Sequence, residues 1–320
     1  MALLEVQQIS KKLQGGLLID QISFDQEMLQ KIAITGESGA GKTTLLKMIG
    51  GRAQPDSGTI LFNGERVIGP DEKLLPGHKE IGYLSQEHDL LHNYKVEDLV
   101  WFQNKLTDEE SATLFEICQI TDFMKRKTDQ LSGGEKQRIA LCMLLTKSPK
   151  MLILDEPFSN LDPIHTDILK AVLEDITDRL QITCLLTSHD PNDTLSWADE
   201  IIVMKKGRII QTGTPEIIYH QPLNEYVAGM FGRYNLLTPA QAALFGIESN
   251  GEDVIIRPEN FIISSNSENG VKGIVQKISF WGSFYELEVA IDYFKIKVNT
   301  QNKWMIAQEL LLTVINKNII

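Results

Sequence analysis

The stretch Gly36-Glu37-Ser38-Gly39-Ala40-Gly41-Lys42-Thr43-Thr44 decides the fold of this chain. It fits the pattern G-x-x-x-x-G-K-[ST], in which glycines let backbone N–H groups approach phosphate oxygens closely. The apolar run 32–34 before it is typical of a buried strand, and residues 45–49 after it are typical of a helix, whose N-terminus favours an anion. We therefore expect the stretch to hold nucleotide phosphates, with Lys42 reaching the β- and γ-phosphates and the Thr43 hydroxyl on Mg²⁺.

The bulk composition narrows the function classes. The 320 residues have room for one large and one small domain, and the net charge is −12 with a pI of about 5.0. An acidic chain without a long basic run is a poor candidate for binding nucleic acid or anionic lipid. Cys118, Cys142 and Cys184 are far apart and form no C-x-x-C pair, which favours buried thiols in a reducing compartment over metal or disulfide roles.

Nothing in the sequence indicates a targeting or membrane segment. The start lacks a basic segment followed by a long apolar run, and no stretch approaches the ~18 apolar residues of a membrane span. We expect a soluble, cytoplasmic protein that would act at a membrane only through a partner.

Two regions flank the nucleotide core. Residues 1–30 predict short strands at 3–6, 17–19 and 22–24, which would form an antiparallel layer beside the core. Residues 87–130 have helical spacing, and a capping box at 107–110 would open a helix through Cys118, so this region is predicted to be a helical insertion. Its residues Trp101 and Phe102 either pack internally or help to meet a partner.

Two further motifs predict chemistry. Ser132-Gly133-Gly134 before an apolar helix would present another exposed, anion-binding N-terminus. In 151–156, four apolar residues followed by Asp155 and Glu156 are typical of a central parallel strand with carboxylates at its C-terminal end, where open α/β sheets bind ligands. One carboxylate suits Mg²⁺, and the next can take a proton from an attacking water.

His189 ends another buried strand, 182–188. A lone histidine is more often structural than catalytic. This one is expected at the same sheet edge as Asp155, Glu156 and the phosphate loop, which favours contact with a γ-phosphate.

Together these motifs resemble the ATP-binding subunit of an ABC transporter over residues 1–235. The resemblance implies an α/β P-loop NTPase core with an antiparallel β layer and a helical subdomain at about 87–130. The motifs that carry it, in order, are a phosphate loop (Gly36–Thr44), a Q-loop (Gln86), an LSGGQ-type signature (Leu131–Arg138), a Walker B strand (Met151–Glu156), a D-loop (Ser159–Asp162) and a switch histidine (His189).

The resemblance also implies roles and partners. ATP and Mg²⁺ would be bound between two copies, with the phosphate loop of one copy facing Ser132-Gly133-Gly134 of the other. Glu156 would be the general base, Asp155 and Gln86 would serve the metal and the water, and His189 would hold the γ-phosphate. Transmembrane permease subunits and a solute-binding protein would complete the transporter, without nucleic acid. The chain would lie on the cytoplasmic face of the membrane, attached through the permease.

The chain departs from the family's pattern at three positions. Glu135 replaces the usual glutamine of the signature, and Asn160 stands where alanine is frequent in the D-loop. The family usually stacks the adenine on an aromatic residue where this chain has Leu13. Leu13 either covers the base without a π contact, which predicts weak selection of ATP over GTP, or only packs in the strand layer, and Phe24 or Tyr83 could cover the base instead.

Residues 236–320 predict a small all-β, barrel-like domain, because segments 271–278, 285–291 and 293–298 alternate apolar and polar residues. The segment Ile256-Arg257-Pro258-Glu259 resembles the start of the OB/TOBE-like domain of importer ATPases for ferric iron, polyamines, sugars, sulfate or molybdate. Arg257 and Glu259 form either a surface salt bridge or a domain interface.

Two classes of function fit these motifs. The first is an ATPase that drives an importer of a small solute. The alternative is a soluble ABC-type ATPase of translation or DNA repair. That class usually has tandem cassettes or a long coiled-coil insertion, and neither is seen, so transport is favoured. The transported solute stays open, because solutes contact the membrane and binding subunits.

Overall fold

The computed structural model describes residues 2–13, 16–86, 90–102, 104–264 and 270–315, without the side chains of Leu13 and Leu17. They form two compact units, Met1–Pro215 and Glu216–Ile320. The predicted α/β core followed by an all-β domain is confirmed.

A six-stranded sheet forms the centre of the first unit. Its strand order is β10-β9-β3-β8-β7-β6, with β10 antiparallel to β9 and the other neighbours parallel. β6, β7 and β8 are buried along their whole length, as expected for parallel strands covered on both faces. The strands are β3 (Lys31–Gly36), β6 (Ile81–Leu84), β7 (Met151–Asp155), β8 (Thr183–Thr187), β9 (Glu200–Lys205) and β10 (Arg208–Gly213).

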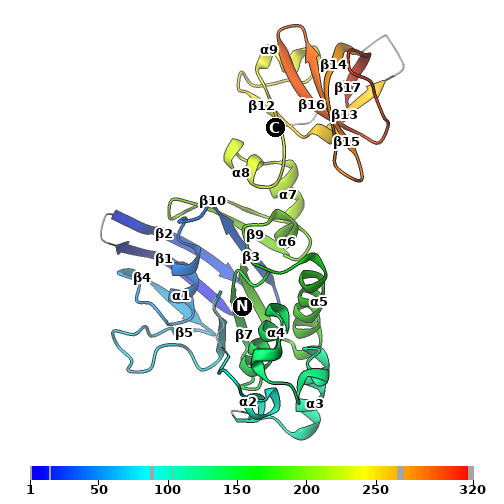
Figure 1. The fold of residues 1–320 in the computed structure, drawn as a ribbon. Coiled ribbons are helices and arrows are strands. Elements are labelled where there is room, and N and C mark those ends of the chain that lie inside the picture. Colours follow the sequence, from blue (N-terminus) through cyan, green and yellow to red (C-terminus); the bar gives the residue numbers. More distant parts are fainter. Residues whose placement is uncertain (1, 14–15, 87–89, 103, 265–269, 316–320) are drawn as a thin grey trace. The chain divides into compact units, whose positions relative to one another are not determined.

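A second, antiparallel sheet has the order β2-β1-β4-β5, from β1 (Leu4–Leu13), β2 (Gly16–Gln26), β4 (Ser57–Phe62) and β5 (Glu65–Arg66). Helix α1 (Lys42–Ile49) joins the core of both sheets, with Leu45 and Ile49 buried among residues of β1, β4 and β7 (Figure 1). β1 and β2 are longer than the strands expected from the sequence. Gln8 and Gln21 have positive φ, and the pairing register shifts near them, so the apolar alternation breaks inside continuous strands.

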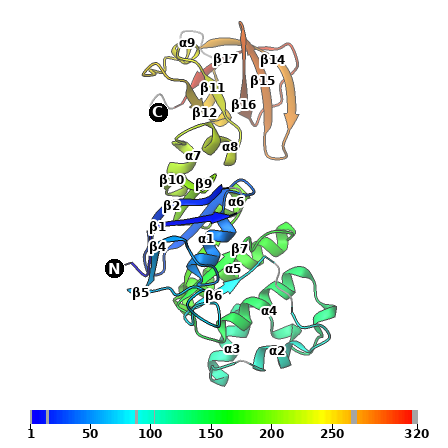
Figure 2. The ribbon, with the colours of Figure 1, turned by 90° about the vertical axis from the view of Figure 1, so that its left-hand side faces the viewer.

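Helices cover the other side of the parallel sheet, where Figure 2 shows α2, α3 and α4 gathered at one end. The predicted capping box at Thr107 and Glu110 is confirmed. Trp101 packs edge-on against Phe115 but remains 45% exposed, and Phe102 is 84% exposed, so neither side chain is buried in the core. The helices are α2 (Val96–Phe102), α3 (Asp108–Ile117), α4 (Gly133–Leu145), α5 (Pro163–Leu180) and α6 (Pro191–Leu195), with 3₁₀ turns at Thr121–Phe123 and Thr128–Gln130.

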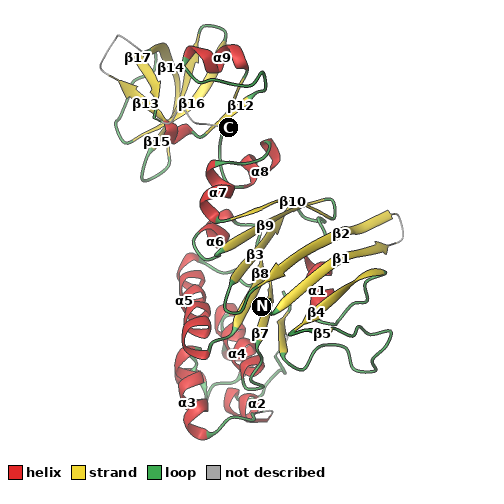
Figure 3. Ribbon diagram, turned by 180° about the vertical axis from the view of Figure 1, so that it is seen from behind, coloured by secondary structure: helices red, strands yellow, loops and turns green. Residues whose placement is uncertain are grey.

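The second unit has a five-stranded antiparallel sheet of order β13-β17-β14-β15-β16 and a two-stranded sheet of β11 and β12 (Figure 3). Both sheets and helix α9 share one apolar core. Its elements are α7 (Pro215–His220), α8 (Glu225–Met230), β11 (Asn235–Leu237), α9 (Pro239–Leu244), β12 (Val254–Ile256), a 3₁₀ turn (Pro258–Asn260), β13 (Phe261–Ser264), β14 (Val271–Phe280), β15 (Tyr285–Ile291), β16 (Phe294–Thr300) and β17 (Glu309–Val314).

Arg257 explains why α7 and α8 belong to this unit. Its side chain is 2% exposed and donates hydrogen bonds to the backbone carbonyls of Tyr219, Ala228 and Arg233. Glu259 instead accepts a hydrogen bond from the Tyr219 hydroxyl, at 2.6 Å. Arg257 is therefore an internal anchor of the unit and does not form a surface salt bridge. The predicted boundary after residue 235 falls at the start of β11.

Candidate active site

The phosphate loop connects the end of β3 to the start of α1. Gly41, the residue before α1, has φ = +100°, a conformation that favours glycine. A Cβ added there would lie 2.6 Å from Ile19 Cδ1 and 3.0 Å from the Leu18 carbonyl oxygen. The turn that exposes the helix N-terminus therefore requires glycine at position 41.

Lys42 lies inside this loop rather than in solvent. Its side chain is 7% exposed, and its ammonium donates to the carbonyls of Gly36, at 2.7 Å, and Glu37, at 3.3 Å. The Glu156 carboxylate lies 4.0 Å away. Burial lowers the pKa of Lys42, against the opposing effect of Glu156, Asp155 and Glu37. The ammonium is thus held inside the curve of the loop, next to the carboxylate of Glu156, the residue that follows β7.

Asp155 is the buried last residue of β7, and three hydroxyls hold its carboxylate. Oδ1 accepts from Thr43 at 3.1 Å and from Thr187 at 2.9 Å, and Oδ2 accepts from Tyr83 at 3.2 Å. Burial, followed by the charge of Asp155, raises the pKa of Tyr83, so its phenol keeps the proton that it donates. The structure thus brings Thr43 and Asp155 together, as the sequence predicts.

Tyr83 in this role was missed by sequence reasoning. All four residues of β6 are buried, so no alternation shows which side chain points toward the site. Tyr83 is only 6% exposed and its hydroxyl is bound to Asp155, so its ring is not available to stack on a nucleotide base. Leu13 ends β1, but its side chain lies outside the described residues, and its role stays a prediction.

Glu156 and His189 meet beside Asp155. His189 Nδ1 lies 3.0 Å from Glu156 Oε2, and the Glu156 backbone N–H donates to the Thr187 hydroxyl at 2.9 Å. Glu156 has φ = +51°, a strained conformation for a residue with a side chain, and such strain is common at functional sites. The predicted juxtaposition of the Walker B glutamate with the histidine is therefore present.

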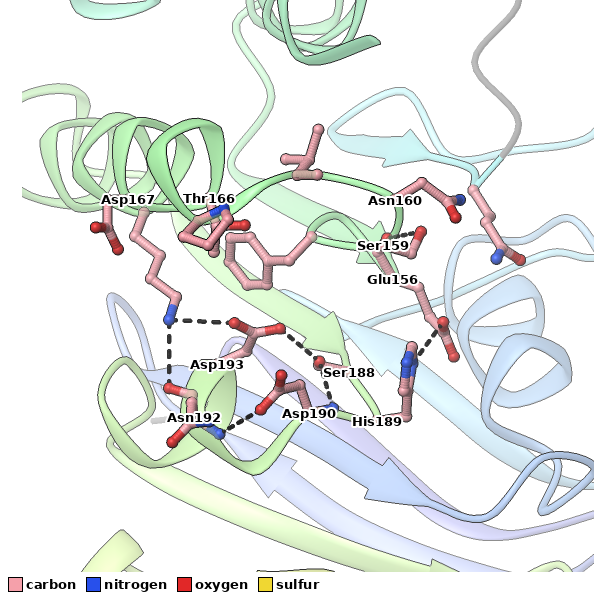
Figure 4. Close-up of a pocket in the computed structure, with 15 residues that line it drawn as sticks. Glu156, Ser159, Asn160, Thr166, Asp167, Ser188, His189, Asp190, Asn192 and Asp193 are labelled. Atoms are coloured by element: carbon pink, nitrogen blue, oxygen red, sulfur yellow. Dashed lines mark hydrogen bonds and ion pairs between the residues drawn. The ribbon is translucent and has the colours of Figure 1, made fainter. Parts of the chain in front are cut away.

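These two residues open onto a cavity of about 500 Å³ (Figure 4). Gln86 and Asn160 also line it, so four of the motifs expected at the site meet there. The lining adds a polar, part-buried network that the sequence did not indicate. Lys170 lies 3.1 Å from Asp193, whose other oxygen accepts from the Ser188 hydroxyl at 3.0 Å.

This network fixes the residue next to His189. The Ser188 hydroxyl also accepts a hydrogen bond from the Asp190 backbone N–H, at 3.1 Å. Ser188 therefore links the backbone that follows His189 to the Asp193 carboxylate. Lys170 and Asp193 are 23 positions apart, on α5 and α6. Such a pairing follows from tertiary packing, which no local pattern in the sequence records.

The signature segment Ser132–Gly134 caps α4. The Ser132 hydroxyl accepts the Glu135 backbone N–H, and the Glu135 carboxylate accepts the Ser132 N–H at 2.8 Å. Glutamate at position 135 therefore completes a capping box. Ser132 and Gly133 are exposed.

Comparisons with known proteins agree with this geometry. A model of the ABC transporter family matches residues 19–159. The chain is 34% identical over 306 residues to the Fe(3+) ions import ATP-binding protein FbpC 2 of Rhodococcus jostii, an alignment that covers 90% of this chain and 88% of that protein. The chain belongs to the ATP-binding subunits of ABC transporters. It is an ATPase whose ATP hydrolysis is coupled to transport, which confirms the transport interpretation.

Other ABC subunits give the same result. The spermidine/putrescine import ATP-binding protein PotA of Mycoplasma mycoides subsp. mycoides is 33% identical over 314 residues, with 90% of this chain and 88% of that protein covered. The sulfate/thiosulfate import ATP-binding protein CysA of Synechocystis sp. is 31% identical over 303 residues, with 89% and 84% covered. The structure of cbiO1 from Clostridium perfringens, part of the ABC transporter complex cbiONQ, has a TM-score of 0.61 at 27% identity and covers 68% of this chain and 90% of that one.

ABC ATPase subunits bind ATP and work with permease components. Within the part of this subunit that the structure describes, none of the helices has the length and apolar character needed to cross a membrane.

Proposed function

We propose that this subunit powers an importer of a small solute of the ferric iron, polyamine, sugar or oxyanion class. The observation that carries the proposal is the alignment with import subunits for Fe(3+), spermidine/putrescine and sulfate/thiosulfate along 84–88% of their own lengths. That length includes residues beyond the ATPase core, where this chain has its all-β unit. The subunit would lie on the cytoplasmic face, attached through permease subunits that receive solute from a binding protein.

Thr43, Asp155 and Gln86 would hold Mg²⁺. Their chemistry fits, because a hydroxyl and a carboxylate oxygen lie 3.1 Å apart, and Mg²⁺ prefers hard oxygen ligands. When bound, Mg²⁺ neutralises charge on the phosphates. The loop from Gly36 to Thr44 would bind the phosphates through its backbone N–H groups and Lys42.

Glu156 would act as the general base for the attacking water. Its carboxylate is part-exposed at the cavity, and a hydrogen bond to His189 orients it. Gln86, on the same cavity, would position the water. His189 would hold the γ-phosphate, with its peptide fixed by Ser188.

The ATP site would be shared between two copies. Ser132 and Gly133 are exposed at the N-terminus of α4, a position that favours an anion. The anion bound there would be a phosphate of the ATP held in the other copy's phosphate loop.

Transport by the reconstituted complex tests whether the solute is imported or exported. The subunit would be co-purified with its permease, placed in proteoliposomes and supplied with binding protein and labelled Fe³⁺, spermidine, sulfate or maltose. We expect one solute class to accumulate on the side of the membrane that carries this subunit and ATP. Movement of solute away from that side would contradict import, and a Lys42→Ala complex provides the inactive control.

A further inference from the structure

Tyr83 holds one of the two oxygens of Asp155. Its hydroxyl donates to Oδ2, whereas Oδ1 accepts from Thr43 and Thr187. Within the described ranges Tyr83 is the side-chain donor to Oδ2. A carboxylate bound through one oxygen can rotate about its Cβ–Cγ bond, and a donor on the second oxygen prevents that rotation.

The surroundings of Tyr83 show that its hydroxyl is more than a by-product of packing. The ring is enclosed. The Arg52 guanidinium lies 4.8 Å from its centre, and a Cβ added at Gly50 would lie 3.1 Å from its Cδ2. A phenylalanine ring would fill this space equally well. Burying the hydroxyl costs its hydration, and among the described residues the hydrogen bond that offsets this cost is the one to Asp155.

We propose that Tyr83 is a positioning residue for the divalent cation: it fixes Asp155 Oδ2 so that Oδ1 stays beside the Thr43 hydroxyl, where the cation binds. This inference rests on the metal role proposed above for Thr43 and Asp155. Outer partners of this kind orient the ligand without touching the metal, and their loss lowers metal affinity. Tyr83 is therefore expected to affect the metal and to leave nucleotide affinity in the absence of metal unchanged.

Tyr83→Phe tests the hydroxyl while keeping the ring. The readouts are the affinity of the ATP-bound protein for Mn²⁺, by electron paramagnetic resonance, and the affinity for ATP in EDTA. We expect Mn²⁺ affinity to fall by about tenfold, the lower end of the range for such partners, with ATP affinity in EDTA within about twofold of wild type. The Mg²⁺ concentration for half-maximal hydrolysis should rise by the same factor, and excess Mg²⁺ should restore the rate.

Tyr293→Phe is the matched control, because Tyr293 is 75% exposed in the other unit. It should leave Mn²⁺ affinity unchanged. If Tyr83→Phe also leaves Mn²⁺ affinity unchanged, or lowers ATP affinity equally with and without metal, Tyr83 only packs and the inference is wrong.

Asp155→Asn, alone and combined with Tyr83→Phe, separates this inference from the metal site itself. We expect Asp155→Asn to weaken Mn²⁺ binding and the second change to add nothing, because the two residues act as one unit. If the double variant loses Mn²⁺ affinity by a further tenfold, the positioning role of Tyr83 is wrong, while the proposed metal site stands. Unchanged Mn²⁺ affinity in Asp155→Asn would overturn the proposed metal site, and with it the role of Tyr83.

Discussion

At the scale of single residues, the end of β7 separates two carboxylates by their surroundings. Asp155 is 4% exposed and bound by three hydroxyls, whereas Glu156 faces the cavity with His189 as its partner. In a regular strand, consecutive side chains point to opposite faces of the sheet. Glu156 directly follows β7 and has positive φ, so its side chain does not follow this alternation. The proposed roles fit this difference: the fixed carboxylate would hold a cation, and the one at the cavity would accept a proton from water.

Replacing Glu156 by Gln should separate binding from hydrolysis. Gln keeps the shape but cannot take a proton, so we expect hydrolysis to fall by at least ~100-fold, the scale for losing a general base. ATP affinity should stay near that of wild type, because Lys42, Thr43 and Asp155 are unchanged. Single-turnover hydrolysis and equilibrium ATP binding measure the two effects. Glu174→Gln, on the exposed side of α5, is the control, and turnover of Glu156→Gln within twofold of wild type would exclude Glu156 as the base.

At the scale of elements, the start of α4 depends on close contact with α5. A Cβ on Gly134 would lie 2.8 Å from His165 Cδ2, whereas a Cβ on Gly133 would have no neighbour within 4 Å. His165 is itself fixed at the start of α5, where its N–H and its Nδ1 both contact the Asp162 carboxylate. The two glycines of the signature therefore differ: the second is required by packing, and the first is free to face a ligand.

Gly134→Ala should lower the free energy of unfolding of the first unit by about 1–3 kcal/mol, the usual cost of overpacking. Gly133→Ala should be neutral or slightly stabilising, because it only restricts the unfolded chain. His165→Ala in the Gly134→Ala background should recover part of the loss. Urea unfolding followed by hydrogen exchange in α4 measures these effects. Equal losses for the two glycine variants would show that His165 does not set the requirement.

Local patterns predicted these elements well and their distant contacts poorly. The phosphate loop, the Walker B strand, the cap at Thr107 and the approach of His189 to Glu156 follow from glycine placement, apolar runs and strand ends. Tyr83 could not be placed because its strand is buried on both faces. Lys170 with Asp193, and Arg257 with α7 and α8, are pairings that exist only after the chain has folded.

At the scale of the whole molecule, the second unit carries its own polar anchor. Burial lowers the pKa of Arg257, yet three backbone carbonyls and the Tyr219 ring, 4.3 Å away, surround its guanidinium. Removing this side chain would take a charged donor from three carbonyls, although the Ala228 carbonyl would keep its bond from the Phe231 N–H. The residues proposed to bind the nucleotide all lie in the other unit, so the stability of the second unit and ATP binding should be separable.

Arg257→Met should destabilise the second unit by about 1–3 kcal/mol, the usual cost when acceptors inside a protein lose a charged donor. Hydrogen exchange in β11–β17 should accelerate while ATP affinity stays unchanged. Lys303→Met, at an exposed position of the same unit, is the control and should change neither. Loss of ATP binding in a folded Arg257→Met protein would show that the two units are not independent in this respect.

Mixing two inactive variants tests most directly whether two copies share the ATP site. Lys42→Ala removes the lysine proposed to bind the phosphates, and Ser132→Arg places a bulky side chain at the exposed start of α4. In a mixed pair, one shared site carries both changes and the other carries neither, so about a quarter of all sites are intact at random two-fold pairing. We predict hydrolysis well above that of either variant alone. Hydrolysis no greater than the average of the two variants, with mixed pairs shown to form, would contradict the shared site.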